Sequence, residues 1–288
     1  MSMTIAATAS TAAGGDDPIL FRGPFEETIP QMAALGYRAV ELHIYDSDQI
    51  DRERLYRLLA ENHVVLTSIG TGSAYERDGI CLGSSDPEKR AAAIRRLTGH
   101  MVTAAPFHGI VIIGLIAGRF SDCGQDGEAF KRNLTESLKL CAKEAKAHDV
   151  TLGFEVMNRF ESDYGTTIRE ASGLLRAVGS DRLKLHLDTV HLNIEEDDIG
   201  KAIESAGSAV CHVHVADNNR WYPGHAHYNF TETLTALHRV GYRGALALEI
   251  TNAPDTELSL IHISCTRHGV PRNPAVRRRH LFRVFRPH

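Results

Sequence analysis

Strand-like and helix-like patterns alternate along most of this chain, with only short polar breaks between them. Strands are predicted at residues 4–8, 38–44, 64–69, 108–116, 150–156, 183–189, 210–216 and 245–250. Helices are predicted between them, at 25–35, 51–62, from 87 onward, and at 126–148, 167–178, 199–206 and 230–240. Because parallel strands joined by helices cross over with one hand, this alternation predicts a closed α/β barrel.

Local signals support the same architecture. Leu-Gly-Tyr-Arg at 35–38 recurs as Val-Gly-Tyr-Arg at 240–243, each time between a predicted helix and a predicted strand. Asp86 and Pro87 supply the N-cap and first-turn chemistry that begins a long helix. With 288 residues the chain can bury one large core, and α/β barrels of about 250 residues commonly form one domain. We predict a single (β/α)8 TIM-barrel domain over residues 1–257.

Polar side chains share one face of two predicted strands. Alternation places His186 and Asp188 together on one face of residues 183–189, and His212 and His214 together on one face of residues 210–216. In a closed barrel such a face turns inward, and its polar residues at the carboxyl ends of the strands form the active site. A single strand histidine is more often a satisfied core or surface residue. Six of the sixteen histidines, however, lie between residues 186 and 227.

Four strand ends carry side chains that bind divalent metals. Glu155, Asp188, His214 and Glu249 each lie at the carboxyl end of a predicted strand. Three carboxylates and one imidazole suit a hard or borderline cation, so we predict one divalent ion, with Mn²⁺ preferred over Mg²⁺ or Co²⁺. Any one of these carboxylates alone would be read as a surface charge, but four converging side chains indicate a site.

Composition limits the partners. The formal net charge is -4, and the five cysteines lie far apart without a CxxC pair, which argues against a disulfide framework or a zinc knuckle. The N-terminal segment MSMTIAATASTAAGG has no basic region ahead of an apolar core, and no run approaches the ~18 to 20 apolar residues of a membrane span. We expect a cytoplasmic protein with a small-molecule partner and no nucleic-acid or membrane partner; a homo-oligomer is left open.

Three longer motifs carry a family resemblance. They are Glu155-Val-Met-Asn-Arg-Phe-Glu161, Leu187-Asp-Thr-Val-His-Leu-Asn-Ile-Glu-Glu196, and His212-Val-His-Val-Ala-Asp-Asn-Asn-Arg220 followed by Pro223-Gly224. These motifs resemble the signatures of the xylose-isomerase-like TIM-barrel sugar epimerases, the D-tagatose 3-epimerase-like group, over residues 4–252. The segments at 69–75, 111–119 and 217–221 are most similar to the 5-keto-L-gluconate epimerase branch, which acts on keto sugar acids.

The resemblance implies an activity and assigns roles. The implied reaction is a metal-dependent epimerisation of a ketose or keto sugar acid, in which the carbon next to the ketone is inverted through an enediolate. The metal ligands would be Glu155, Asp188, His214 and Glu249. The substrate would be held by Glu161, His191 and Arg220. Glu155 and Glu249 would also be the catalytic acid and base on opposite faces of the sugar.

Other functions remain open on the sequence. A sugar isomerase of the hydroxypyruvate isomerase type, or a lyase of the inosose dehydratase type, would use much the same residues. An apurinic endonuclease of the endonuclease IV type would need more metal ligands on the early strands, where Glu41 and His43 are the only candidates, and an acidic barrel repels phosphate. A non-catalytic sugar-binding barrel is the remaining alternative.

The C-terminal segment departs from the family. From Leu258 onward the chain has seven arginines, no lysine and no acidic residue. A basic arm for nucleic acid is one interpretation of this composition. The segment lacks the helical apolar period of about 3.6 residues, where the family resemblance implies an eighth helix. We therefore predict that residues 258–288 are a non-native or disordered tail and that the eighth helix is missing or replaced.

Overall fold

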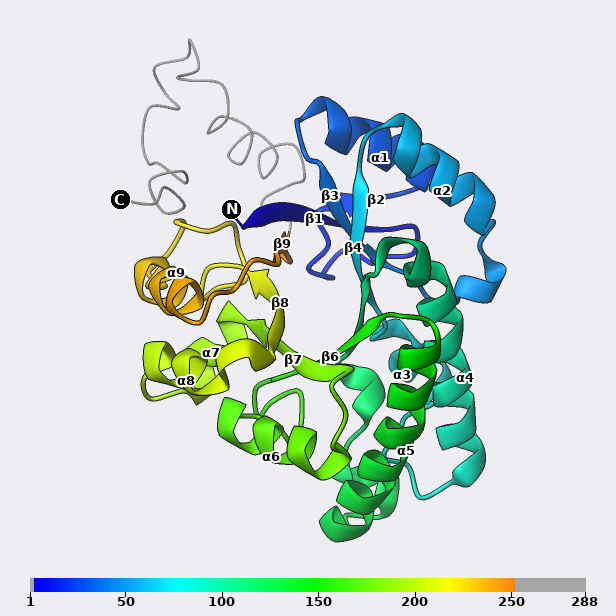
Figure 1. Cartoon of the computed structure of the whole chain (residues 1–288), viewed down its shortest axis with the longest axis vertical. Coiled ribbons are helices and arrows are strands. Elements are labelled where there is room, and N and C mark those ends of the chain that lie inside the picture. The colour runs from blue at the N-terminus through cyan, green and yellow to red at the C-terminus, as the bar shows by residue number, and fades with distance from the viewer. Residues whose placement is uncertain (1–2, 252–288) are drawn as a thin grey trace.

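Eight parallel strands close into a barrel in the computed structural model, which describes residues 3–251 (Figure 1). The barrel strands are β1 (Thr4–Ser10), β3 (Ala39–His43), β4 (Val65–Gly70), β5 (Ile110–Ile113), β6 (Thr151–Glu155), β7 (Leu183–Asp188), β8 (Val210–Val215) and β9 (Ala245–Leu248). They follow one another in chain order, and β9 pairs with β1 to close the sheet. The two-residue strand β2 (Phe21–Arg22) pairs with the end of β1. The predicted TIM barrel is confirmed.

Helices surround the barrel on the outside (Figure 1). The larger ones are α1 (Phe25–Ala34), α2 (Arg52–Glu61), α4 (Pro87–Ala104), α5 (Gly127–Ala147), α6 (Ile168–Val178), α8 (Ile199–Ala206) and α9 (Phe230–Arg239). Short helices α3 (Ser73–Asp78) and α7 (Thr189–Glu195) follow β4 and β7. The 3₁₀ turns are Ser47–Gln49, Ala105–Phe107, Leu115–Ala117, Phe120–Cys123 and Gly207–Ala209. Side chains of Asp51, Asp86, Asp126, Thr167, Asp198 and Asn229 cap the helices that follow them, which explains where those helices begin.

The hydrophobic core lies mainly between the strands and the surrounding helices. Phe21, Phe130 and Phe154 are among its largest fully buried side chains. A separate small cluster consists of four alanines on β1, β3 and β9, among them Ala39 and Ala245 at the starts of their strands. Small side chains therefore fill this part of the barrel, and the polar residues lie toward the carboxyl ends of the strands.

One predicted strand end was wrong, and two short helices were not predicted. The strand predicted at 108–116 ends at Ile113, because the chain turns at Gly114 into a 3₁₀ turn whose residues Ile116 and Ala117 are also buried. The apolar run thus reflected burial and did not mark the end of the strand. Residues 73–78 form α3 and residues 189–195 form α7, and neither helix was predicted. Both helices are too short to show an apolar period.

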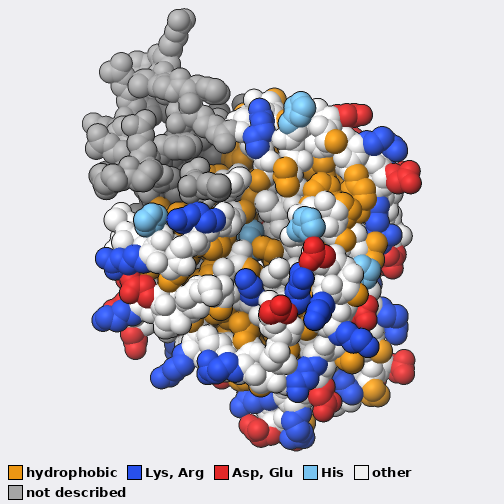
Figure 2. Space-filling model, in the orientation of Figure 1, with side chains coloured by type: hydrophobic (Ala, Val, Ile, Leu, Met, Phe, Trp, Pro, Cys, Tyr) orange, Lys and Arg blue, Asp and Glu red, His pale blue; other side chains and the backbone are white. Residues whose placement is uncertain are grey.

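None of the described helices is long and apolar enough to cross a membrane. The four cysteines in this part of the chain form no disulfide. Acidic and basic side chains are interspersed on the face shown in Figure 2. The predictions for the tail at 258–288 and for the eighth helix lie outside the described residues.

Candidate active site and metal centre

The four predicted metal ligands converge at the carboxyl end of the barrel. Nδ1 of His214, on β8, lies 3.2 Å from Oε2 of Glu249 and 3.7 Å from Oδ2 of Asp188. The same nitrogen lies 4.0 Å from Oε1 of Glu155. Asp188 ends β7, Glu155 ends β6, and Glu249 follows β9 directly. The structure therefore brings together all four residues that the sequence proposed for the metal.

This donor set fits a divalent cation. Asp188 and His214 are fully buried, and Glu249 is 7% exposed, so their charges are shielded poorly by water. Several buried carboxylates in one place are stable only when positive charge compensates them. Ligand atoms of Glu155, Asp188 and His191 lie within 4.8 Å of one another, as do those of Glu41, His214 and Glu249. Oxygen-rich sites with one imidazole suit Mn²⁺, Mg²⁺ or Co²⁺.

Glu41 lies beneath the metal ligands and is hydrogen-bonded to the histidines around it. It is fully buried on β3, and its carboxylate accepts hydrogen bonds from Nε2 of His214 at 2.7 Å and Nε2 of His212 at 2.7 Å. It also accepts from Nε2 of His43 at 2.8 Å and from Oγ of Ser68 at 2.6 Å. Burial raises the pKa of Glu41, but the neighbouring histidines outweigh burial and hold this pKa well below its ordinary value. Glu41 is therefore ionised and turns Nδ1 of His214 toward the other carboxylates.

The sequence did not identify this role of Glu41. From the sequence, Glu41 and His43 are predicted only as candidate metal ligands of an endonuclease. The available signal was a carboxylate in the middle of a predicted strand, between the apolar residues Val40 and Leu42, which are both buried. Such a residue must have partners inside the barrel.

Arg220 lies directly against the metal ligands. Its guanidinium donates to Asp188 with one NH₂ group and to Glu249 with the other. Burial lowers the pKa of Arg220, but the two carboxylates outweigh burial and raise it, so the side chain is a permanent cation. Its backbone has φ 64°, a left-handed conformation that costs a non-glycine residue about 1 kcal/mol or more. Hydrogen bonds from its N–H to Asp217 at 2.8 Å and from Thr251 to its carbonyl at 2.8 Å hold this conformation.

The other two predicted substrate residues lie beside Glu155. Nδ1 of the buried His191 lies 2.7 Å from Nδ2 of Asn158, and its Nε2 lies 3.6 Å from Oε1 of Glu155. Glu161 accepts a hydrogen bond from the same Asn158 at 3.0 Å and stays partly exposed. Burial lowers the pKa of His191, but Asp188 and Glu155 outweigh it and the pKa is raised. A polar wall therefore borders the metal ligands, as substrate binding requires.

Electrostatics keep the carboxylate ligands Glu249 and Asp188 ionised and leave His186 neutral. Burial raises the pKa of Glu249, but Arg220 and His214 outweigh burial, so this pKa is lowered. The pKa of Asp188 is held well below its ordinary value, because Arg220 and the nearby histidines outweigh its burial. Burial, followed by the charges of His214 and His212, holds the pKa of His186 well below its usual range.

A cavity of about 250 Å³ opens over these residues. It is smaller than the ~300 to 1,000 Å³ typical of sites for drug-sized ligands and suits one small sugar. Its lining joins Glu155, Glu161, His191, Arg220 and Glu249 to residues of the early loops. Two glycines leave room for it: a Cβ at Gly114 would lie 2.4 Å from Oε2 of Glu155, and one at Gly70 would lie 2.7 Å from the ring of His43.

Known proteins share this architecture. The family profile of the xylose isomerase-like TIM barrel matches residues 29–268. The chain is 31% identical to the L-ribulose 3-epimerase of Mesorhizobium japonicum over 229 residues, which cover 78% of this chain and 74% of that protein. It is 29% identical to the D-psicose 3-epimerase of Enterocloster bolteae over 237 residues, which cover 78% of this chain and 76% of that protein.

Solved structures agree. The crystal structure of D-psicose 3-epimerase with D-tagatose from Clostridium cellulolyticum H10 superposes with a TM-score of 0.73 and 27% identity, covering 86% of this chain and 85% of that one. The resemblance that the strand-end motifs predicted is confirmed. The chain belongs to the xylose isomerase-like TIM barrel family.

Proposed function

We propose that this protein is a divalent-metal-dependent ketose 3-epimerase, an isomerase that inverts the carbon next to the ketone of a small sugar. The observation that carries the proposal is the arrangement around Nδ1 of His214, with Glu249, Asp188 and Glu155 at 3.2, 3.7 and 4.0 Å. Three of these four residues, His214, Glu155 and Glu249, line a sugar-sized cavity. The relatives named above act as 3-epimerases of ketoses, which supports the same reaction class here.

Two carboxylates would move the proton. A bound divalent ion would supply Lewis-acid stabilisation of the negative charge that develops on the ketone oxygen. Glu155 and Glu249 come from strand ends separated by β7 and β8, so they approach the cavity from different directions. Inversion needs a base on one face of the carbon and an acid on the other, and either glutamate can serve as each. The reaction would therefore be reversible.

Arg220 bears on the choice of substrate. Sequence resemblance suggested a keto sugar acid, whose carboxylate a free guanidinium would bind in a planar fork. Both arms of Arg220 are already paired, with Asp188 and Glu249. This pairing favours a neutral ketose over a keto sugar acid, with Glu161 and His191 available for its hydroxyl groups.

The proposal is tested by a substrate panel. The purified full chain, loaded with Mn²⁺, would be incubated with D-psicose, D-fructose, D-tagatose, L-ribulose and a keto sugar acid. We expect the C3 epimer of at least one neutral ketose. Appearance of an aldose would point to a sugar isomerase, loss of water to a lyase, and nicking of an abasic-site duplex to an endonuclease. Metal and sugar binding without any turnover would favour the alternative function, a non-catalytic sugar-binding barrel.

We also propose that residues 1–257 form the one catalytic domain and that the protein acts in the cytoplasm. Mn²⁺ is the proposed ion because the four ligands are mostly oxygen donors. Metal analysis of the protein purified without added ions would check this choice. If one equivalent of an ion other than Mn²⁺ is found, that ion is the proposed cofactor in place of Mn²⁺.

A further inference from the structure

His186 is a buried side chain that the proposed reaction does not use. It lies on β7, two residues before Asp188, and is 0% exposed. Within residues 3–251, neither of its ring nitrogens has a hydrogen-bond partner. Burying an imidazole without partners costs free energy, and such groups in native proteins commonly mark the position of a bound ion or water.

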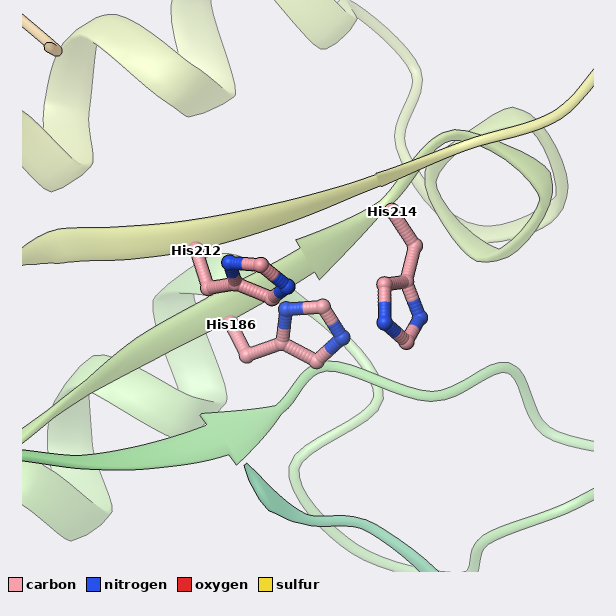
Figure 3. Close-up of side chains that lie close together, drawn as sticks. All are labelled: His186, His212 and His214. Atoms are coloured by element: carbon pink, nitrogen blue, oxygen red, sulfur yellow. The ribbon is translucent and has the colours of Figure 1, made fainter. Parts of the chain in front are cut away.

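The ring of His186 faces the metal centre. Glu155 on β6 and His186 on β7 are register partners, and Nε2 of His186 lies 3.7 Å from Oε1 of Glu155. Its ring packs edge to face against His214, with centroids 4.1 Å apart and planes at 78°. One ring nitrogen each of His186, His212 and His214 lie within 4.8 Å of one another. Figure 3 shows these three rings gathered on the same side of β7 and β8.

His186 differs from its two neighbouring histidines in its hydrogen bonds. Nε2 of His212 and Nε2 of His214 both donate to Glu41, at 2.7 Å each. The ring of His186 makes no such bond, so both its nitrogens stay free to bind an ion. Nε2 of His186 and Nδ1 of His214 lie 3.7 Å and 4.0 Å from the same oxygen, Oε1 of Glu155, so an ion bound at that oxygen is within reach of both rings.

We propose that His186 is a fifth protein ligand of the metal centre, reaching the ion from the strand position beside Glu155. This inference rests on the metal site of the proposed function. It changes the donor set from one imidazole to two, alongside three carboxylates. Imidazole favours Co²⁺, Ni²⁺ and Zn²⁺ over Mn²⁺ and Mg²⁺ more strongly than carboxylate does. His186 would therefore raise the affinity for Co²⁺ more than the affinity for Mn²⁺.

Calorimetric titration of the metal-stripped full chain with Mn²⁺ and with Co²⁺ tests this directly. His186→Leu should weaken Co²⁺ binding by at least about tenfold, the loss that even an outer-shell partner produces, and Mn²⁺ binding by less. His100→Leu is the matched control, because His100 is also 0% exposed with an unpartnered Nε2, but lies on α4 against Ser47. This control should leave both affinities unchanged.

A structural role of His186 makes a different prediction. Leu removes an unpartnered imidazole and fills its space, so metal-free His186→Leu should melt at the same temperature as the metal-free wild type or higher. A lower melting temperature in the metal-free protein, with the affinity ratio of Co²⁺ to Mn²⁺ unchanged, would show that the ring only packs and would overturn the proposal.

A second measurement needs no variant. Pulsed electron paramagnetic resonance of Mn²⁺ bound to the wild type, labelled with ¹⁵N-histidine, counts the coordinated imidazole nitrogens. Two coordinated imidazoles are expected, and one would overturn the proposal even if His186→Leu fails to fold. If the wild type binds no divalent ion, both this inference and the proposed function fail. If it binds one with a single imidazole, only this inference fails.

Discussion

Oε1 of Glu41 accepts a hydrogen bond from Nε2 of His214 at 2.7 Å, joining β3 to β8 across the interior of the barrel. The bond fixes which nitrogen of His214 carries the proton. Nδ1 is thereby presented to Asp188, Glu155 and Glu249 as a ligand. Glu41 thus helps to shape the metal centre by orienting one of its ligands.

Replacing Glu41 by Gln should weaken Mn²⁺ binding by about 10- to 100-fold. The neutral amide holds the ring of His214 less firmly than the carboxylate does, and the negative charge of Glu41 is lost. Calorimetry on the metal-stripped protein measures this loss. Ser68→Ala is the milder control, since it removes one donor to Glu41 and leaves the bond to His214 in place. Equal affinities for wild type and Glu41→Gln would show that Glu41 does not orient the ligand.

Gly114→Ala should disable the site while keeping the fold. The new Cβ would lie 2.4 Å from Oε2 of Glu155, so the carboxylate would have to move away from the cavity. We expect kcat for epimerisation to fall by at least about tenfold, since small displacements of a reacting group are costly. Gly72→Ala, in the same cavity wall, meets only Leu115 at 3.7 Å and should retain activity. Equal activity of the two variants would contradict this account of Gly114.

Arg220→Gln should destabilise the metal-free protein by about 3 kcal/mol, because it leaves Asp188 and Glu249 without their cation. Urea unfolding in the presence of a chelator measures the effect. Arg220→Lys should lose less, since it keeps the charge but cannot bridge two carboxylates in a fork. Added Mn²⁺ should restore part of the loss in Arg220→Gln, and a loss that Mn²⁺ does not reduce would argue against a shared site.

His100 makes stability depend on pH. Burial holds its pKa at about 3, against an ordinary value of 6.5. Between these values the unfolded chain binds one more proton than the folded chain at this site, so the free energy of unfolding falls as pH falls. From pH 6.5 to 5 the wild type should lose about 1.6 kcal/mol more than His100→Leu. The exposed His238 on α9 supplies the control. The free energy of unfolding of His238→Leu should change with pH by the same amount as that of the wild type.

The strand ends could be predicted from the sequence because their signal is local. Alternation with period two and a polar residue at the carboxyl end are enough to select Asp188 and His214 within single strands. Glu41 could not be assigned in this way, since its partner His214 lies 173 residues further along the chain. Only closure of the barrel brings β3 and β8 to face each other across its interior.

Loops were harder for the same reason. The motif that contains Arg220 was recognised, but its pairing with two metal ligands depends on a left-handed backbone position that the sequence did not reveal. The helix α7 was missed because Asp188 serves both as the end of β7 and as the cap of the helix that follows. A strand pattern and a helix start overlap at that residue.

We propose that Glu155 and Glu249 exchange a proton at the carbon next to the ketone, and deuterium incorporation during turnover tests this mechanism. The Mn²⁺-loaded wild type would convert its best ketose in D₂O, and the product would be examined by NMR. We expect one solvent deuterium at C3 of each epimer molecule formed, because acid and base are separate residues on different faces. Epimer that retains the original hydrogen at C3 would contradict it.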